Sequence, residues 1–196
     1  MKIVKNEKIK YFKNLISDWT QPVLSSNGEV GISDFAVWAT GARSAGPAYR
    51  AFDNVSGHAW VSNVTSKPCV YGFYSKTPLN ISKLTWQNNN GRNYNITGGT
   101  FQGSNDYANW TDLATIDYNT TPSAIRTFNI SSTEYYKYFR FYITSSYNSS
   151  ETGNECYIGY IQITATQCVT VESNPQQFDF TNTIMTYNCI KNKVLK

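Results

Sequence analysis

The segment Tyr138-Phe-Arg-Phe-Tyr-Ile-Thr144 decides the fold class, because its residues alternate strictly between two kinds. The odd-numbered positions hold Phe139, Phe141 and Ile143, whereas the even-numbered positions from 138 to 142 hold tyrosine or arginine. A period of two residues places these sets on opposite faces of an extended chain. The segment therefore predicts a β-strand with one buried face and one partly solvated face.

Similar β-rich runs, separated by clusters of Gly, Asn, Ser and Pro, extend in both directions from this segment. They cover Phe35–Ala39, Cys69–Tyr74, Ile81–Trp86, Ile96–Gln102, Arg126–Ile130 and Tyr157–Thr164. No long stretch has helical periodicity. Short strands at this spacing are typical of a β-sandwich or jelly roll. We therefore expect an all-β domain.

The composition agrees with this class and excludes several others. The 196 residues are 15% charged and 15% aromatic, with 15 Tyr, 10 Phe and 5 Trp. A disordered chain has more charge and fewer aromatic residues, and a coiled coil is rich in Glu, Lys, Leu and Ala. No apolar run approaches the roughly 20 residues of a membrane-spanning helix. We therefore expect no membrane insertion.

The formal net charge of +4 is concentrated in the two ends of the chain. Residues 1–27 carry five lysines and two acids, residues 28–167 carry nine basic and nine acidic residues, and residues 168–196 carry three lysines and two acids. Because nucleic-acid binders concentrate positive charge on a folded face, we expect no nucleic-acid partner. The turn-rich stretch Pro22–Gly28 marks the first boundary.

These ranges define the expected organisation. A β-sandwich is predicted over residues 28–167, with short extensions over residues 1–27 and 168–196 for docking or oligomerisation. Within the first extension, residues 2–12 are typical of two short strands around the Asn6-Glu7 turn. Both extensions carry apolar residues to bury, but each is too short to form a core of its own.

Three further motifs follow one another along the chain. They are Ala48-Tyr-Arg-Ala-Phe-Asp-Asn54 with Ala59-Trp-Val-Ser62, Phe101-Gln-Gly-Ser-Asn-Asp106 with Asn109-Trp-Thr-Asp-Leu113, and Tyr138–Tyr142 with Ile158-Gly-Tyr-Ile-Gln-Ile163. Together they resemble the discoidin family, also called factor V/VIII type C or galactose-binding-like domains. The resemblance covers residues 28–167 and implies a discoidin-like jelly-roll β-sandwich. Because this fold hosts binding to sugars, lipids, proteins and virion scaffolds, it leaves the function open.

The resemblance also implies a structural calcium site. In the family, an Asp, a hydroxyl, loop carbonyls and a Glu near the last strand bind the ion, and Asp53 and Ser56 match the first two. Tyr160 stands at the Glu position, and Glu155 comes five residues too early. Calcium takes about six to eight oxygen ligands. Two alternatives stay open: a Ca²⁺ site on Asp53 and Ser56, or an Asp53 carboxylate that caps its own loop.

Five side chains are candidate ligand contacts: His58, Asn90, Arg92, Tyr147 and Trp38. A histidine, planar amides and a guanidinium suit sugar hydroxyls, and aromatic rings suit the apolar face of a sugar. We expect the four loop residues to gather at one end of the sandwich, whereas alternation along its strand turns Trp38 outward. A plain surface histidine and an ordinary Asn-rich turn are the structural alternatives for His58 and for residues 88–92.

Several other residue types are expected to serve the core or the covalent structure. Phe52, Trp60, Trp86 and Trp110 are predicted core side chains. The cysteines lie at positions 69, 156, 168 and 189, too far apart for the CxxC pairs of zinc sites. Buried thiols are therefore expected, with Cys168–Cys189 as the one pair that could form a disulfide.

The sequence predicts a binding protein and no enzyme. His58 is the only histidine, which removes most acid–base and triad chemistry, and no phosphate-binding loop is present. The main hypothesis is a bacteriophage virion surface component, from a tail, fibre or head appendage, that binds host glycan or takes part in particle assembly. Its support is the discoidin-like core, the lysine-bearing extensions, the Asn-, Thr- and Tyr-rich composition and an N-terminus unlike a secretory signal.

The virion hypothesis implies other virion proteins, a cell-surface glycan and further copies of this chain, in a homo-oligomer, as partners. The alternative is an extracellular bacterial carbohydrate-binding module, secreted or at the cell surface.

Overall fold

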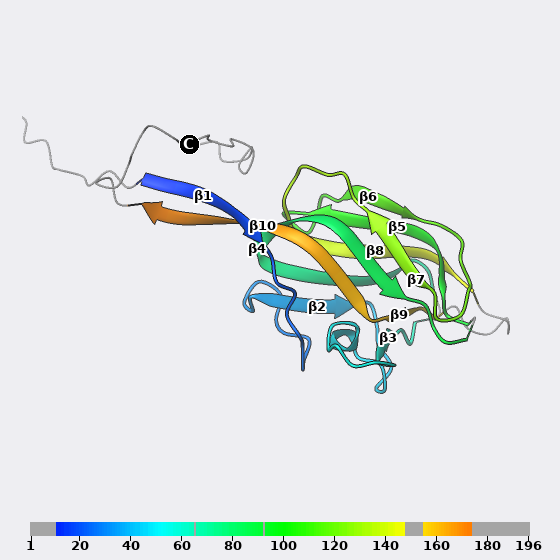
Figure 1. The fold of residues 1–196 in the computed structure, drawn as a ribbon. Helices are drawn as coiled ribbons and strands as arrows, with labels where there is room; N and C mark the ends of the chain where they lie inside the picture. Colours follow the sequence, from blue (N-terminus) through cyan, green and yellow to red (C-terminus); the bar gives the residue numbers. More distant parts are fainter. Residues whose placement is uncertain (1–10, 65, 92, 148–154, 174–196) are drawn as a thin grey trace, which may run out of the picture.

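The computed structural model describes residues 11–64, 66–91, 93–147 and 155–173, and it confirms the predicted β-sandwich (Figure 1). The elements are β1 (Tyr11–Asp18), β2 (Phe35–Ala39), the 3-10 turn η1 (Ala48–Ala51), β3 (Ala59–Val61), β4 (Cys69–Gln87), β5 (Ile96–Ser104), β6 (Thr111–Ile116), β7 (Ile125–Asn129), β8 (Tyr136–Ser146), β9 (Tyr157–Gly159) and β10 (Ile161–Ser173). Strands β1, β10, β4, β8, β5 and β6 follow one another by hydrogen bonding, β2 and β7 pair with β4, and β3 pairs with β9.

Strand β4 contributes to both layers of the sandwich. Its first part pairs with β2 and β8, and its part from Leu79 onward pairs with β10 and β7. The register with β8 shifts between Tyr74 and Leu79. Pro78 lies in this interval and has no backbone N–H to donate to a neighbouring strand. The 19-residue strand therefore turns the corner from one layer to the other.

The core fills the space between these layers with aromatic rings. Phe139, Phe141 and Ile143 are fully buried, which confirms the face predicted from their alternation. Ring centroids of Trp86 and Phe141 lie 5.4 Å apart, and Phe73 stacks on Phe139 at 5.0 Å. Close packing of this kind fixes the strand framework from which the loops project.

The observed strands differ from the predicted runs in several places. The runs 69–74 and 81–86 form one continuous strand, because the corner at Pro78 bends the chain without ending it. The run 157–164 divides at Tyr160 into β9 and β10. Strands β3 and β6 were not predicted, since three residues are too few for a visible pattern and β6 has only Leu113, Ala114 and Ile116 as apolar residues. Strand β1 was not predicted beyond its first two residues, because the predicted strands of the first extension end at residue 12.

The segment before β2 lies against the body of the sandwich. The ring of Trp19 is 5.7 Å from that of Phe35. The side-chain amide of Gln21 donates to the carbonyl of Ile161 at 2.8 Å and accepts from the backbone N–H of Ile163 at 2.8 Å. This part of the predicted N-terminal extension thus contributes to the packing of β10.

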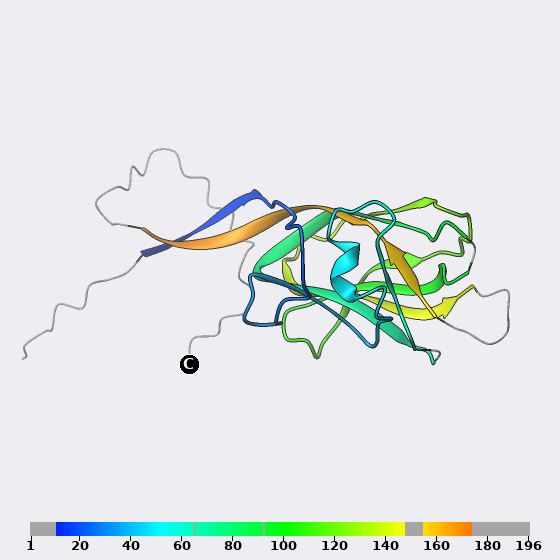
Figure 2. The same ribbon diagram turned by 90° about the horizontal axis from the view of Figure 1, so that it is seen from below.

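Strand β1 and the end of β10 form a two-stranded ribbon that leaves the body, as Figures 1 and 2 both show. The pairing runs from Tyr11 opposite Ser173 to Asp18 opposite Thr166, so β10 passes through the predicted boundary at residue 167. The predicted hairpin at residues 2–12 lies largely outside the described residues, as do residues 174–196. In the described part of the chain, no helix has the length and hydropathy to cross a membrane.

Candidate functional site

The loops after β4 and β8 meet at one end of the sandwich. The backbone N–H of Tyr94 donates to the carbonyl of Tyr147 at 2.6 Å, and the N–H of Tyr147 donates to the carbonyl of Asn95 at 2.8 Å. Asn95 also accepts from the N–H of Asn89 through its side chain at 2.7 Å. Because these bonds tie the two loops together, side chains on them are held at fixed relative positions.

Arg43, Tyr94 and Glu155 form a polar cluster at this end, which we call the loop-end cluster. The guanidinium of Arg43 lies 5.5 Å from the ring centroid of Tyr94. Its Nε donates to Oε1 of Glu155 at 3.0 Å, and its Nη2 donates to Oε2, so the pair is bidentate. The hydrogen bond with Glu155 raises the pKa of Arg43 against the opposing effect of burial. A planar donor is therefore fixed in orientation beside an aromatic ring.

The backbone holds each member of the loop-end cluster in place. The N–H of Arg43 donates to the carbonyl of Val61 at 2.8 Å, which anchors the β2–β3 loop to β3. Tyr94 has a left-handed backbone with φ of 70°, uncommon for tyrosine. The Arg43 side chain nevertheless stays 47% exposed, whereas that of Glu155 is 12% exposed. Arg43 can therefore reach a ligand while Glu155 holds it from beneath.

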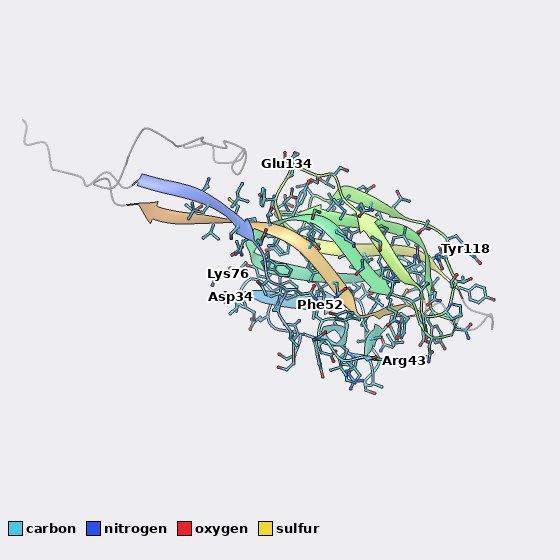
Figure 3. The ribbon with its side chains drawn as sticks, viewed as in Figure 1. Asp34, Arg43, Phe52, Lys76, Tyr118 and Glu134 are labelled. Carbon is cyan, nitrogen blue, oxygen red and sulfur yellow. The ribbon has the colours of Figure 1, made fainter. Side chains whose placement is uncertain are left out.

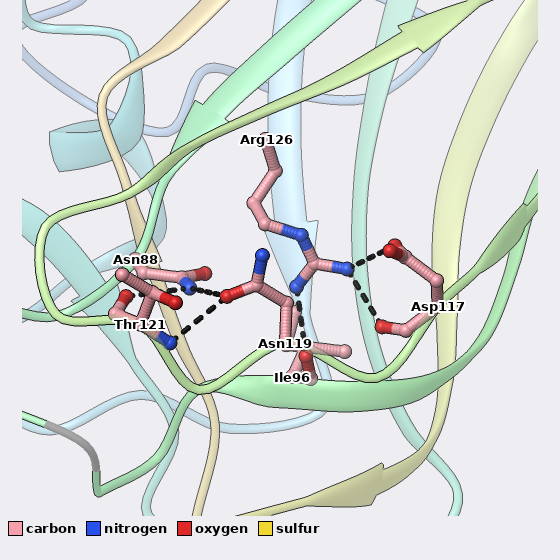
Figure 4. A network of polar contacts seen from close by, with 6 residues as sticks. All are labelled: Asn88, Ile96, Asp117, Asn119, Thr121 and Arg126. Atoms are coloured by element: carbon pink, nitrogen blue, oxygen red, sulfur yellow. Dashed lines mark hydrogen bonds and ion pairs between the residues drawn. The ribbon is translucent and has the colours of Figure 1, made fainter.

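A second polar network fixes the neighbouring β6–β7 loop (Figure 4). Arg126 is 4% exposed, and its two Nη groups donate to the carbonyls of Ile96 and Asp117 at 3.0 and 2.7 Å. Asn88 donates to the carbonyl of Thr121 at 3.1 Å, which links this loop to the β4–β5 loop. The network gives the loop end a rigid base, because buried polar groups are strongly held once they are paired.

The structure brings two of the predicted ligand residues to the loop end. Asn90 is exposed on the β4–β5 loop, and Tyr147 is half-buried on the adjoining loop. Arg92 lies outside the described residues. The contacts of His58 are within its own loop. Its backbone N–H donates to the carbonyl of Val55 at 3.1 Å, and its ring Nδ1 lies 2.6 Å from Asp53 Oδ2.

The sequence missed the loop-end cluster because its ion pair joins residues 112 positions apart. No local pattern connects Arg43 to Glu155, and Tyr94 resembles many other tyrosines of the chain. The run of asparagines from 88 to 90 was the available signal, since it marked the loop on which Tyr94 lies.

The carboxylate of Asp53 caps its own loop. Asp53 Oδ1 accepts from the N–H of Val55 at 3.0 Å, and Oδ2 is bonded to His58. Glu155, the nearest acid in sequence to the expected ligand position, is paired with Arg43. Among the described residues, no group of three or more His, Cys, Asp and Glu residues could hold a metal ion. Both oxygens of Asp53 are thus bonded within the loop, which favours the capping alternative, and the Ca²⁺ site on Asp53 and Ser56 stays a prediction.

The predicted orientations of the tryptophans hold for all but Trp110. Trp60 and Trp86 are buried in the core, and Trp38 faces outward over Gly72. The prediction of a buried Trp110 is wrong: its ring is half-buried on the outside of the sheet, where the guanidinium of Arg140 lies 4.0 Å from its centroid. The physical reason is that Arg140 provides a cation–π partner on that face.

Two buried thiols lie behind the loop-end cluster. Cys69 and Cys156 are free and fully buried, as predicted. Lys67 donates to the sulfur of Cys156 at 2.8 Å, and the hydrogen bond between the two thiols lowers the pKa of Cys69 to about 6. Cys168 is disulfide-bonded, whereas Cys189, its predicted partner, lies outside the described residues.

The model of the F5/8 type C domain matches residues 36–157. The chain belongs to the F5/8 type C domain family. This confirms the resemblance drawn from the three motifs, all of which begin within the matched residues. A comparison with curated protein sequences gave no match.

Solved structures with the F5/8 type C fold of this chain include several bacterial binding modules. CpGH89CBM32-5 from Clostridium perfringens, solved with GalNAc-β-1,3-galactose, has 17% identity and a TM-score of 0.58, covering 66% of this chain and 94% of that chain. The family 32 carbohydrate-binding module of C. perfringens NanJ, solved with galactose, has 14% identity and a TM-score of 0.56, covering 68% and 93%. Chitosan-binding module 1 from Paenibacillus sp. IK-5 has 20% identity and a TM-score of 0.53, covering 66% and 94%. At such identities the likeness establishes the fold.

Proposed function

We propose that this chain is a non-catalytic carbohydrate-binding module whose loop-end cluster contacts the sugar. The observation that carries the proposal is the half-exposed Arg43 guanidinium, fixed by Glu155 and lying against the ring of Tyr94. Sugar sites combine an aromatic surface for C–H groups with a few planar polar groups for hydroxyls. Asn90 and Tyr147 on the adjoining loops complete the proposed site.

The relatives support the ligand class. Two of them were solved with galactose or GalNAc-β-1,3-galactose, and a third is described as a chitosan-binding module. Galactose and GalNAc-β-1,3-galactose are therefore the first probes. We expect a single copy to bind a sugar weakly and several copies of the module on one assembly to strengthen the binding.

The experiment compares Arg43, which is paired with the largely buried Glu155, with Lys76 of an exposed ion pair at a different end of the body (Figure 3). Arg43→Ala removes the proposed ligand contact, whereas Lys76→Ala removes the exposed Lys76–Asp34 pair as a matched control. Binding to both probes is measured by calorimetry and on a glycan array. We expect Arg43→Ala to weaken binding at least about tenfold and Lys76→Ala to leave it unchanged. Because Arg43→Ala leaves the largely buried Glu155 unpaired, binding is measured well below the melting temperature of each variant. Equal binding by Arg43→Ala and the parent would refute the site.

The cellular setting remains a proposal. The sequence favoured a phage virion component over an extracellular bacterial carbohydrate-binding module, but the solved relatives are bacterial modules, and two of them derive from glycoside hydrolases or a chitosanase/glucanase. They support the alternative better than the virion role. Recovery of the chain from purified phage particles would restore the virion hypothesis, and recovery from a secreted bacterial glycosidase would support the alternative.

A homo-oligomer is part of the same proposal. The ribbon of β1 and β10 exposes Leu15, Ile16 and Val169 by 41%, 50% and 36%. Apolar side chains on a projecting strand pair are suited to contact a further chain. Light scattering of the parent and of a Leu15→Ser/Ile16→Ser variant tests this, and an unchanged mass would count against the role of the ribbon.

A further inference from the structure

One layer of the sandwich consists of β2, the first part of β4, β8, β5 and β6. Its outer face carries one row of residues that runs across these neighbouring strands. Trp38 of β2 lies opposite Gly72 of β4, Gly72 lies opposite Arg140 of β8, Arg140 lies opposite Gln102 of β5, and Gln102 lies opposite Asp112 of β6. We call these residues the outer-face row. Because residues paired in register share a face of the sheet, the row points away from the core.

The β5–β6 loop folds back over this row. The ring of Tyr107 lies 5.4 Å from Trp38 and 5.8 Å from Trp110, and its third aromatic neighbour is Tyr138 at 5.5 Å. Gly72 makes room for the arrangement, since a Cβ there would overlap the Trp38 ring. The result is a continuous aromatic surface around the outer-face row.

Tyr107 is held outward in an unfavourable backbone conformation. Its φ of 64° is left-handed, and its side chain stays 51% exposed. Such a conformation is unfavourable for a residue other than glycine. Ser104 Oγ accepts from the N–H of Tyr107 at 3.0 Å, and Asp106 Oδ1 accepts from the N–H groups of Ala108 and Asn109 at 2.9 and 2.7 Å. Strain that the surrounding bonds maintain at an exposed aromatic ring indicates a function for that ring.

Arg140 supplies unused hydrogen-bond donors at the centre of the row. Its Nε donates to Gln102 Oε1 at 2.7 Å, and Gln102 Nε2 donates to Asp112 Oδ1 at 2.6 Å. The guanidinium is also held between two rings, 4.0 Å from Trp110 and 5.0 Å from Tyr142. Within the described part of the chain, neither Nη group of Arg140 donates a hydrogen bond. Fixed planar donors therefore lie beside the half-buried rings of Trp110 and Tyr142 and near the exposed ring of Tyr107.

The charges of the row indicate the ligand class. Arg140 and the exposed Asp112 are of opposite sign and are linked through Gln102, so the row has no net charge for an anionic ligand. Guanidinium donors, a carboxylate acceptor and aromatic rings together fit a ring that has hydroxyls on its edge and C–H groups on its face.

We propose that the outer-face row, with Tyr107 and Trp110, is a second carbohydrate-binding surface that takes a neutral hexose or N-acetylhexosamine chain. It lies on a sheet face rather than on the loops that carry Arg43 and Tyr94. A chain with both surfaces can hold one polymeric glycan at two points or crosslink two glycans, which raises avidity without a tighter single site.

The experiment isolates this surface with Tyr107→Gly. Glycine relieves the left-handed strain, which offsets part of the loss of the ring contacts with Trp38, Trp110 and Tyr138. The melting temperature of each variant is therefore recorded, and affinity is compared where all variants are folded. Tyr118→Ala removes another ring, 70% exposed on the β6–β7 loop, and serves as the control. All variants are made in the Arg43→Ala background, so that failure of the loop-end site does not affect the outcome. The probes are GalNAc-β-1,3-galactose, chitotetraose and the neutral members of a glycan array.

Two readouts are recorded for each variant: affinity, and the tryptophan indole signals in NMR spectra of ¹⁵N-labelled protein. We expect a neutral glycan to shift the Trp38 and Trp110 signals in the Arg43→Ala protein, and Tyr107→Gly to weaken that binding at least about tenfold. Tyr118→Ala should behave as its background. Equal affinity of Tyr107→Gly, or glycan binding that leaves both indole signals unmoved, would overturn the proposal. Concentration-dependent shifts of these signals without glycan would instead identify a contact between copies of the chain and would also overturn it.

Discussion

His58 Nδ1 lies 2.6 Å from Asp53 Oδ2, so the carboxylate that the family resemblance offered to calcium is bonded to the only imidazole of the chain. The other oxygen of Asp53 accepts from the backbone N–H of Val55. The loop is thus closed by its own side chains. Glu155, the acid that comes five residues before the expected ligand position, is bonded to Arg43.

Calcium is therefore expected to leave the stability unchanged. A ligand that binds only the folded state raises the melting temperature, so calcium chloride and EGTA should give melting temperatures within about 1 °C of each other. Asp53→Ala should destabilise the protein by about 1–2 kcal/mol in EGTA, because the N–H of Val55 loses its acceptor. A calcium-dependent rise of several degrees that Asp53→Ala abolishes would show that the ion displaces His58.

Truncation of Trp60 is expected to be among the most damaging single changes. The side chain is fully buried, its ring lies 5.0 Å from that of Tyr71, and its Nε1 donates to the carbonyl of Gly41 at 2.9 Å. Trp60→Ala should lower the free energy of unfolding by about 3–5 kcal/mol, as measured by urea denaturation. Tyr118→Ala, at an exposed ring, should change it by less than about 0.5 kcal/mol. Similar losses for both variants would contradict the packing described for Trp60.

Gly72→Ala is expected to displace Trp38 from the outer face. The added Cβ would overlap the indole ring, which must swing away or push the strands apart. We expect a loss of about 1–3 kcal/mol of stability and a changed Trp38 indole signal. Gly91→Ala is the matched control, because nothing lies within 4 Å of its Cβ position. An unmoved Trp38 signal in Gly72→Ala would show that the ring does not rest on β4.

The Cys69–Cys156 pair predicts a pH dependence of stability. The hydrogen bond from Cys156 lowers the pKa of Cys69 from 9.0 to about 6. A group whose pKa is lower in the folded state stabilises the fold fully above its unfolded pKa and loses that effect as the pH falls through the folded pKa. The stability difference between the parent and Cys69→Ala should therefore grow from pH 6 to pH 8.5, roughly the ordinary thiol pKa.

Urea denaturation of both proteins at several pH values measures this difference, with reductant held constant. Cys156→Ala should remove the pH dependence, because it removes the hydrogen bond that favours the Cys69 thiolate. A difference that stays flat from pH 6 to pH 8.5 would show that both thiols remain protonated.

The sequence predicted those features that depend on local pattern. Alternation along residues 138–144 gave both a strand and its buried face, and the three motifs gave the family. Pro78 concealed the continuity of β4, because a proline between two apolar runs resembles a break, whereas here it turns a corner. Trp110 was placed in the core because its partner Arg140 lies on another strand.

The candidate site was less predictable, because most of its contacts join residues that are far apart in the sequence. Asn90 and Tyr147 were found because loops rich in asparagine or tyrosine are visible in the sequence. The Arg43–Glu155 pair and the outer-face row are set by strand register between distant segments, which residue patterns do not encode.

The pairing of β1 with β10 also constrains how the protein is made. Ser17 accepts a hydrogen bond from Gln167, 150 residues later, so β1 has no partner until most of the chain has left the ribosome. During synthesis, the backbone groups of β1 therefore have no strand partner, while β4, β5 and β8 can already pair with one another. Contacts of such high sequence separation form slowly, and an unpaired strand edge is prone to intermolecular pairing. Until β10 has been synthesised, β1 is therefore a segment of this domain that is open to pairing with another chain.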